Sequence, residues 1–134
     1  MTNVTRGLGL AVALALSGGA AGAQSLAGSD EYMRACASCH GLTGHGDGML
    51  SDYLTVEVPD LTRIRARNDG VFPVLQMMHV IDGRTGLRAH GSPMPIWGDR
   101  FEATAAMRAG DLGAEIEVRG RLQALIAHLE AIQE

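Results

Sequence analysis

Segments with a helical spacing of apolar positions alternate along this chain with glycine-rich segments that have none. The clearest helical pattern runs from about Leu112 to Ile132, where apolar side chains recur every three or four residues and polar ones lie mostly between them. This spacing is typical of an amphipathic helix. No stretch alternates convincingly between apolar and polar residues, so the pattern predicts helices and loops without strands. We expect the last helix to pack on the first and to close the fold.

The first helix of the mature chain is predicted to begin near Glu31. Ser29 or Asp30 can cap its amino end, because their side-chain oxygens accept hydrogen bonds from free backbone N–H groups. The helix is expected to end at His40, followed by Gly41 as a left-handed residue after the last turn.

A second helix is predicted from Phe72 to Asp82. Pro73 can open it, since the first turn of a helix needs no N–H donor at that position, and Gly83 stops it. The segment is apolar on nearly all sides. Such helices are usually buried, and Met77 and Met78 are most simply core residues.

Glycine and proline mark three connecting segments. Residues 41–57 contain four glycines, the last of them in the turn signal Asp47-Gly48. This composition predicts a loop that bends sharply and approaches its neighbours closely. Residues 59–70 begin at a proline and end in an Asn-Asp-Gly turn. A third loop is predicted over residues 83–100.

The amino terminus has the pattern of a secretory signal peptide. Arg6 precedes a nine-residue apolar run, and Ala21-Gly22-Ala23 supplies a small-x-small cleavage site. We expect residues 1–23 to be removed and residues 24–134 to form one domain in the periplasm. The alternative, an uncleaved anchor, has too short an apolar run, because a spanning helix needs about 20 residues. No membrane span is therefore expected after cleavage.

Charge and composition limit the classes of partner that the chain can be expected to bind. The chain has a net charge of −4 and no Lys, and without Arg6 the mature chain has ten Arg against fifteen acids, a charge of −5. No basic run exists, so nucleic acid is not an expected partner, nor is an anionic lipid surface bound through a polybasic segment. Aromatic residues make up only 4%, so the core would gain from a large, flat, apolar cofactor.

The sequence Cys36-Ala37-Ser38-Cys39-His40 is the attachment signature of a c-type haem. Positions i, i+3 and i+4 of a helical turn share one face. The two thiols can therefore bond to haem vinyl groups while His40 binds the iron, and residues 41–57 are expected to wrap against this haem. A thioredoxin-like redox pair, half a zinc site or a structural disulfide are the alternatives. The chain has no other Cys and no evident βαβ pattern, which disfavours the first two.

Met94 is the candidate for a second iron ligand. Pro93 and Pro95 stiffen the backbone on both sides of it, which would present its thioether sulfur in one direction. The simpler interpretation is a methionine that fills a gap under a loop. His90, in the same loop, is the rival ligand. His45 and His79 are expected to be polar residues rather than ligands.

The mature chain resembles the class I mono-haem cytochromes c of bacterial periplasms. The resemblance spans nearly all of residues 28–132, in the family's order. Its pieces are YMRACASCHG (32–41), GHGDG (44–48), VPDLT (58–62), IDGR (81–84), HGSPMPIWG (90–98) and the terminal helix. It implies an all-α cytochrome c fold, with helices and glycine-rich loops wrapped around one covalently attached haem.

The same resemblance implies roles for single residues. His40 would be the proximal ligand and Met94 the distal one, and the carbonyl of Pro59 would orient the His40 ring. Arg84 and Trp97 would lie near the haem propionates. Two departures are His128, where the family often has Tyr, and the absence of Lys, which leaves the docking surface unassigned.

The function implied by the resemblance is electron transfer, not enzyme catalysis. His and Met would fill both axial positions of the iron, which disfavours substrate chemistry there. The implied partners are a bc-type complex, a dehydrogenase or a terminal oxidase. The protein itself is expected to be a monomer or a subunit of a small complex. The alternatives are a permanent haem subunit of a dehydrogenase, and a haem enzyme or gas sensor whose Met ligand is displaced.

Overall fold

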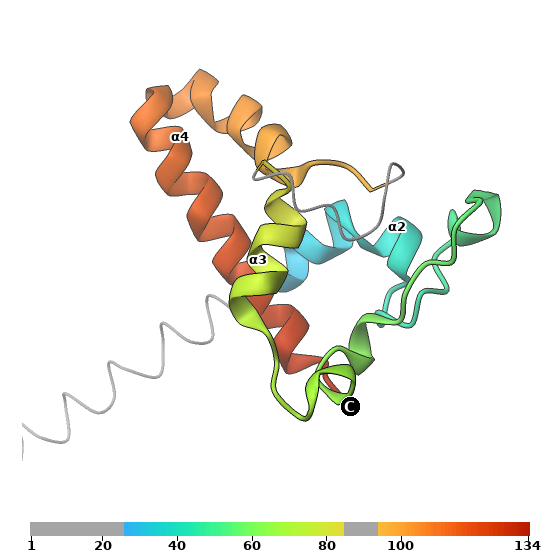
Figure 1. Cartoon of the computed structure of the whole chain (residues 1–134). Coiled ribbons are helices and arrows are strands. Elements are labelled where there is room, and N and C mark those ends of the chain that lie inside the picture. The colour runs from blue at the N-terminus through green and yellow to red at the C-terminus, as the bar shows by residue number, and fades with distance from the viewer. Residues whose placement is uncertain (1–25, 85–93) are drawn as a thin grey trace, which may run out of the picture.

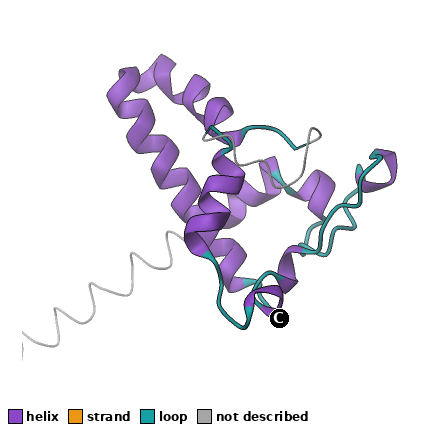
Figure 2. Ribbon diagram, in the orientation of Figure 1, coloured by secondary structure: helices purple, strands orange, loops and turns teal. Residues whose placement is uncertain are grey.

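The structure is a computed structural model that describes residues 26–84 and 94–134. Within these residues the chain is helical and has no strand, so the prediction of an all-α protein is confirmed for this part (Figures 1 and 2). The elements in chain order are a helix at residues 26–35, α2 (Ala37–His40), the short 3₁₀ helices η1 (Ser51–Tyr53), η2 (Leu61–Arg63) and η3 (Ala66–Asn68), α3 (Val74–Asp82) and α4 (Trp97–Ala131). None of the described helices is both long and apolar enough to cross a bilayer. The predicted signal peptide, His90 and Pro93 lie outside the described residues.

The helix at residues 26–35 crosses the carboxyl-terminal part of α4. At the crossing a Cβ on Gly28 would lie 2.0 Å from the carbonyl oxygen of Ala124, so only glycine lets the two backbones come this close. One turn later the rings of Tyr32 and His128 lie 5.0 Å apart between their centroids. The predicted packing of the last helix on the first is therefore confirmed, with His128 itself making the contact.

The core of the described chain gathers around this crossing. Arg121 on α4 reaches Glu31 with a hydrogen bond from each of two nitrogens, at 2.9 and 3.0 Å. The buried apolar residues are Tyr32, Cys36, Ala37, Leu61, Ile64, Phe72, Ile81, Phe101, Val118, Leu122, Leu125, Ile126 and Leu129. They come from residues 32–37 and 61–129, so residues 38–60 contribute no side chain to this core.

The predicted start of the first helix is wrong. Residues 26–30 are already helical, and the capping positions Ser29 and Asp30 lie inside the helix. Packing of Gly28 on α4 outweighs the weak helix propensity of glycine, as tertiary contacts often do. The chain turns at Cys36, and α2 then carries the rest of the motif.

Helix α4 begins fifteen residues before the predicted start at Leu112. Gly110 breaks it, with φ 67° and ψ 176°, into two helical segments that meet at an angle (Figure 1). The break ends the regular apolar spacing, so the pattern of the second segment does not extend into the first. A weaker signal was present, because the buried residues Phe101 and Ala105 stand four positions apart.

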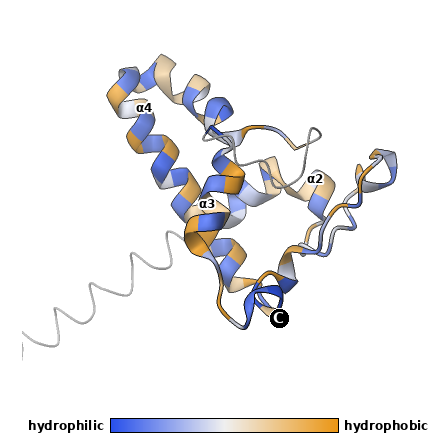
Figure 3. Cartoon of the chain, in the orientation of Figure 1, coloured by the Kyte–Doolittle hydropathy of each residue, from blue (hydrophilic) through white to orange (hydrophobic). Residues whose placement is uncertain are grey.

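Helix α3 has the predicted carboxyl end, and Gly83 follows it with a left-handed φ of 69°. Its predicted burial is confirmed on the side that packs on α4, where Met77 and Met78 lie against the core. Only Ile81 is buried, however, and Leu75 is 67% exposed. The helix packs against α4 along one face, so the apolar residues on its other sides are not all covered. Figure 3 shows apolar and polar residues mixed along α3.

His128 should make folding less favourable as the solution becomes mildly acidic. Burial lowers the pKa of its ring in the folded protein, whereas the unfolded chain takes up that proton near pH ~6.5. The unfolded state then binds the proton first, so stability is full above about pH 6.5 and falls as the pH drops from there toward the lowered pKa. Urea unfolding at a series of pH values below about 6.5 should show this fall.

His128→Gln should remove this part of the acid destabilisation, because the Gln side chain does not titrate. His45→Gln is the matched control, since His45 lies on the exposed loop after α2, and it should leave the fall in place. An unchanged fall in His128→Gln would contradict the assignment.

Candidate functional site

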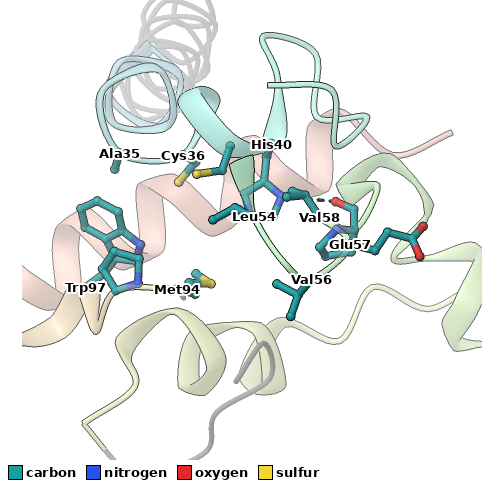
Figure 4. A pocket seen from close by; sticks show the side chains of 12 residues that line it. Ala35, Cys36, His40, Leu54, Val56, Glu57, Val58, Met94 and Trp97 are labelled. Carbon is teal, nitrogen blue, oxygen red and sulfur yellow. Dashed lines mark hydrogen bonds between the residues drawn. The ribbon is translucent and has the colours of Figure 1, made fainter. Parts of the chain in front are cut away.

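Most of the residues that the sequence singles out line one cavity of about 370 Å³ (Figure 4). This volume lies within the ~300–1,000 Å³ of small-molecule and cofactor sites. Its walls come from the Cys36–His40 motif, from the loop before η2 and from the start of α4. The described lining residues are Ala35, Cys36, Cys39, His40, Leu54, Val56, Glu57, Val58, Pro59, Met94, Pro95 and Trp97.

The turn at Cys36 and the helix α2 place the motif on the cavity wall. The Cys36 carbonyl accepts hydrogen bonds from the N–H groups of Cys39 and His40, at 3.1 and 2.9 Å, which fixes the predicted one-sided turn. Both thiols are free, and both line the cavity. Burial, with smaller effects from Glu31 and Cys39, raises the pKa of the Cys36 thiol to about 12. Redox-active C-x-x-C pairs need a lowered pKa, so this geometry disfavours a thioredoxin-like role.

The glycine-rich loop after α2 supports the motif through backbone hydrogen bonds. Its backbone N–H groups bind the three carbonyls that the end of α2 leaves without a helical partner. These bonds run from Gly46 to His40 (2.8 Å), from Gly48 to Cys39 (3.1 Å) and from Leu50 to Ser38 (2.9 Å). The close approach that the glycines predict is therefore made to the backbone of α2.

His40 is buried, and its ring is oriented by the next loop. Its Nδ1 lies 3.2 Å from the carbonyl oxygen of Pro59, and a carbonyl can only accept a hydrogen bond. The proton therefore belongs on Nδ1, which leaves the lone pair of the ring on Nε2, the tautomer suited to metal binding. The N–H of Leu61 donates to the Gly44 carbonyl at 2.6 Å and ties this loop to the one after α2.

Met94 and Trp97 approach the cavity from a different part of the chain, opposite the motif in Figure 4. Met94 follows His40 by 54 residues, yet both line the same cavity. Trp97 begins α4 and packs on Phe101, with 5.7 Å between the ring centroids. Among the methionines that the structure describes, only Met94 belongs to the lining.

Arg84 is not brought together with the other predicted site residues. Its guanidinium binds three carboxylates, those of Asp82 (2.6 Å), Glu115 (2.9 Å) and Glu102 (3.3 Å), and it is absent from the described cavity lining. These bonds, the one to Asp82 above all, raise the pKa of Arg84. Arg84 thus joins the end of α3 to both segments of α4, beside Gly98, where a Cβ would meet the Asp82 carboxylate at 1.7 Å.

Leu54, Val56, Glu57 and Val58 also line the cavity. The first three belong to the segment 41–57 that is expected to lie against the cofactor, but the sequence singled out none of the four individually. Valines at two-residue spacing before Pro59 were the available signal, since such spacing puts both side chains on one side of an extended segment.

Across residues 26–84 and 94–134, no group of three or more His, Cys, Asp or Glu side chains could hold a metal ion. Comparisons of the chain with protein-family models, with curated proteins and with solved structures found no match.

Proposed function

We propose that the protein is a periplasmic electron carrier that holds one c-type haem covalently through Cys36 and Cys39. The observation that carries this proposal is the shared cavity. Two thiols, an oriented imidazole and a thioether, drawn from segments more than fifty residues apart, line the same space. A C-x-x-C-H motif on a surface without a cavity would not support it.

The residues present fit such a group. Leu54, Val56, Val58 and Trp97 give the cavity largely apolar walls, which suit a flat aromatic ring system. Cys36 and Cys39 supply the thiols for two thioether bonds, and neither is engaged in a disulfide. His40, with its Nδ1 directed to Pro59, offers Nε2 as a ligand, and Met94 offers its sulfur.

A haem bound in this way supplies an iron that changes between the ferrous and ferric states. The chain's own contribution is to hold the ligands in place and to limit the access of water. The Nδ1 bond to Pro59 holds the imidazole in one orientation, so little rearrangement is needed when the oxidation state changes. A thioether ligand favours the ferrous state. His40 and Met94 would together hold the iron, and transfer of electrons would then be favoured over reaction of a substrate at the metal.

The experiment that tests the proposal is a whole-protein mass measurement after denaturation. The protein purified from periplasm should carry the mass of one haem on a chain that begins at Gln24. Cys39→Ser should lose the two-thioether form, because one of its two attachment atoms is gone. Ser38→Ala, at the exposed position between the two cysteines, should keep it. A wild-type mass without haem, or an unchanged attachment in Cys39→Ser, would overturn the proposal.

A further inference from the structure

We infer that the loop around η1 is a docking surface for a protein with an apolar centre and a rim of Lys and Arg. This surface, called the arm surface here, consists of the apolar Met49, Leu50 and Tyr53 and the acidic Asp47, Asp52 and Glu57. It lies on the segment that projects away from the helices, green at the right of Figure 1. All six residues are exposed.

The apolar part of the arm surface is large for a polar loop. Tyr53 is 84% exposed, Met49 79% and Leu50 44%. A short turn holds them together, because the Tyr53 N–H donates to the Leu50 carbonyl at 3.2 Å and the Ser51 hydroxyl to the Gly48 carbonyl at 2.7 Å. None of the three apolar residues lines the cavity, so a cofactor there would leave them uncovered. Grouped exposed apolar side chains with a polar rim are typical of interaction sites.

The charge of the loop selects the partner. Residues 35–62 contain four acids and no Lys or Arg. Three of these acids, Asp47, Asp52 and Glu57, are the exposed rim of the arm surface. Of the two flanking arginines, Arg34 lies 3.7 Å from Asp30 and is thereby partly neutralised. A field of one sign steers and orients a partner of opposite charge.

The acidic rim also disfavours the other occupants. A symmetric dimer through this surface would bring each acid near its own copy, and like charges brought together cost free energy. An anionic lipid surface would be repelled for the same reason. A basic protein is therefore the occupant that the observations favour.

The same loop carries Leu54 and Val58 on the cavity wall, so a partner on the arm surface would lie beside the cavity. That the partner exchanges electrons rests on the proposed function. The surface and the charge of its partner do not, because they follow from exposure and sequence alone.

The test uses isothermal titration calorimetry with two model partners. One is a helical peptide with a leucine face rimmed by lysines, and the other has glutamates in place of the lysines. The wild-type protein should bind the lysine peptide only. Tyr53→Ser should weaken that binding roughly tenfold, as for a central aromatic contact, and Asp52→Asn about threefold, as for an exposed charge pair.

Two variants on α4 are the matched controls. Met107, 83% exposed, matches the apolar residues, and Asp111 is an exposed acid. Met107→Ser and Asp111→Asn should bind the lysine peptide as the wild type does. Circular dichroism should confirm that each variant is folded, and Met49→Ser replaces Tyr53→Ser if the latter is not.

Several results would overturn the inference. These are equal binding of both peptides, no binding of the lysine peptide, and an equal loss in the α4 controls. Dimerisation of the wild type, or binding to phosphatidylglycerol vesicles, that Tyr53→Ser abolishes would assign the surface to another occupant and would overturn it too. The heat of binding does not depend on haem, so failure of the proposed function leaves this result standing, and the reverse is also true.

Discussion

Met94→Ala is expected to abolish the weak sulfur-to-iron charge-transfer band that the proposed haem would give the ferric protein. It should also open the iron to cyanide or carbon monoxide and lower the midpoint potential, because a thioether favours the ferrous state. The structural reason is that Met94 is the one described methionine on the cavity lining, where His40 also lies. Absorption spectra with and without cyanide, and a redox titration, measure all three effects.

Met77→Ala and Met107→Ala are the controls for this prediction. Met77 packs against the core from α3, and Met107 is 83% exposed on α4. Both variants should keep the band. The rival ligand His90 lies outside the described residues and would give a bis-imidazole spectrum instead. If Met94→Ala keeps the band while His90→Ala or another methionine variant changes the spectrum, the ligand assignment is wrong.

Gly48→Ala is expected to destabilise the protein by about 1–3 kcal/mol or more, as overpacking against rigid neighbours does. A Cβ at this position would lie 2.5 Å from the Ser38 carbonyl oxygen and 2.5 Å from the Cys39 carbonyl carbon. These are backbone atoms, so they cannot rotate away. The bond from the Gly48 N–H to the Cys39 carbonyl would also be strained. Urea unfolding gives the loss of stability. If the proposed haem attachment holds, the yield of haem-bearing protein should fall with it.

Gly120→Ala is the matched control, because it makes the same chemical change on an exposed turn of α4. Apart from its chain neighbours and the backbone of its own helix, no atom lies within 4 Å of its would-be Cβ. Alanine favours a helix over glycine, so this variant should gain about 0.5–1 kcal/mol. Equal stability of the Gly48→Ala and wild-type proteins would show that the loop does not support the motif as described.

Local signals predicted the parts of the fold that depend on local chemistry. Gly83 ends α3 as expected because its left-handed φ of 69° suits glycine. The start of the first helix was missed because it depends on the contact of Gly28 with Ala124, which is far away in the sequence. The upstream segment of α4 was missed because Gly110 interrupts the apolar spacing.

In the candidate site, too, features set by neighbouring residues were predictable, and features set by distant residues were not. The spacing of Cys36, Cys39 and His40 predicted their common face, because a helical turn decides it. The environment of Arg84 could not be read from its neighbours in the sequence, since two of its three carboxylates, Glu102 and Glu115, come from distant turns of α4.

The measurement that tests the proposed function most directly is the absorption spectrum of the purified protein in both oxidation states. We expect low-spin c-type haem bands in the ferrous protein that carbon monoxide does not alter. In the ferric protein we expect the weak band of a sulfur ligand, because His40 and Met94 would fill both axial positions. A protein without haem absorption, or a five-coordinate spectrum that changes when carbon monoxide is added to the wild type, would contradict an electron carrier with His and Met ligands.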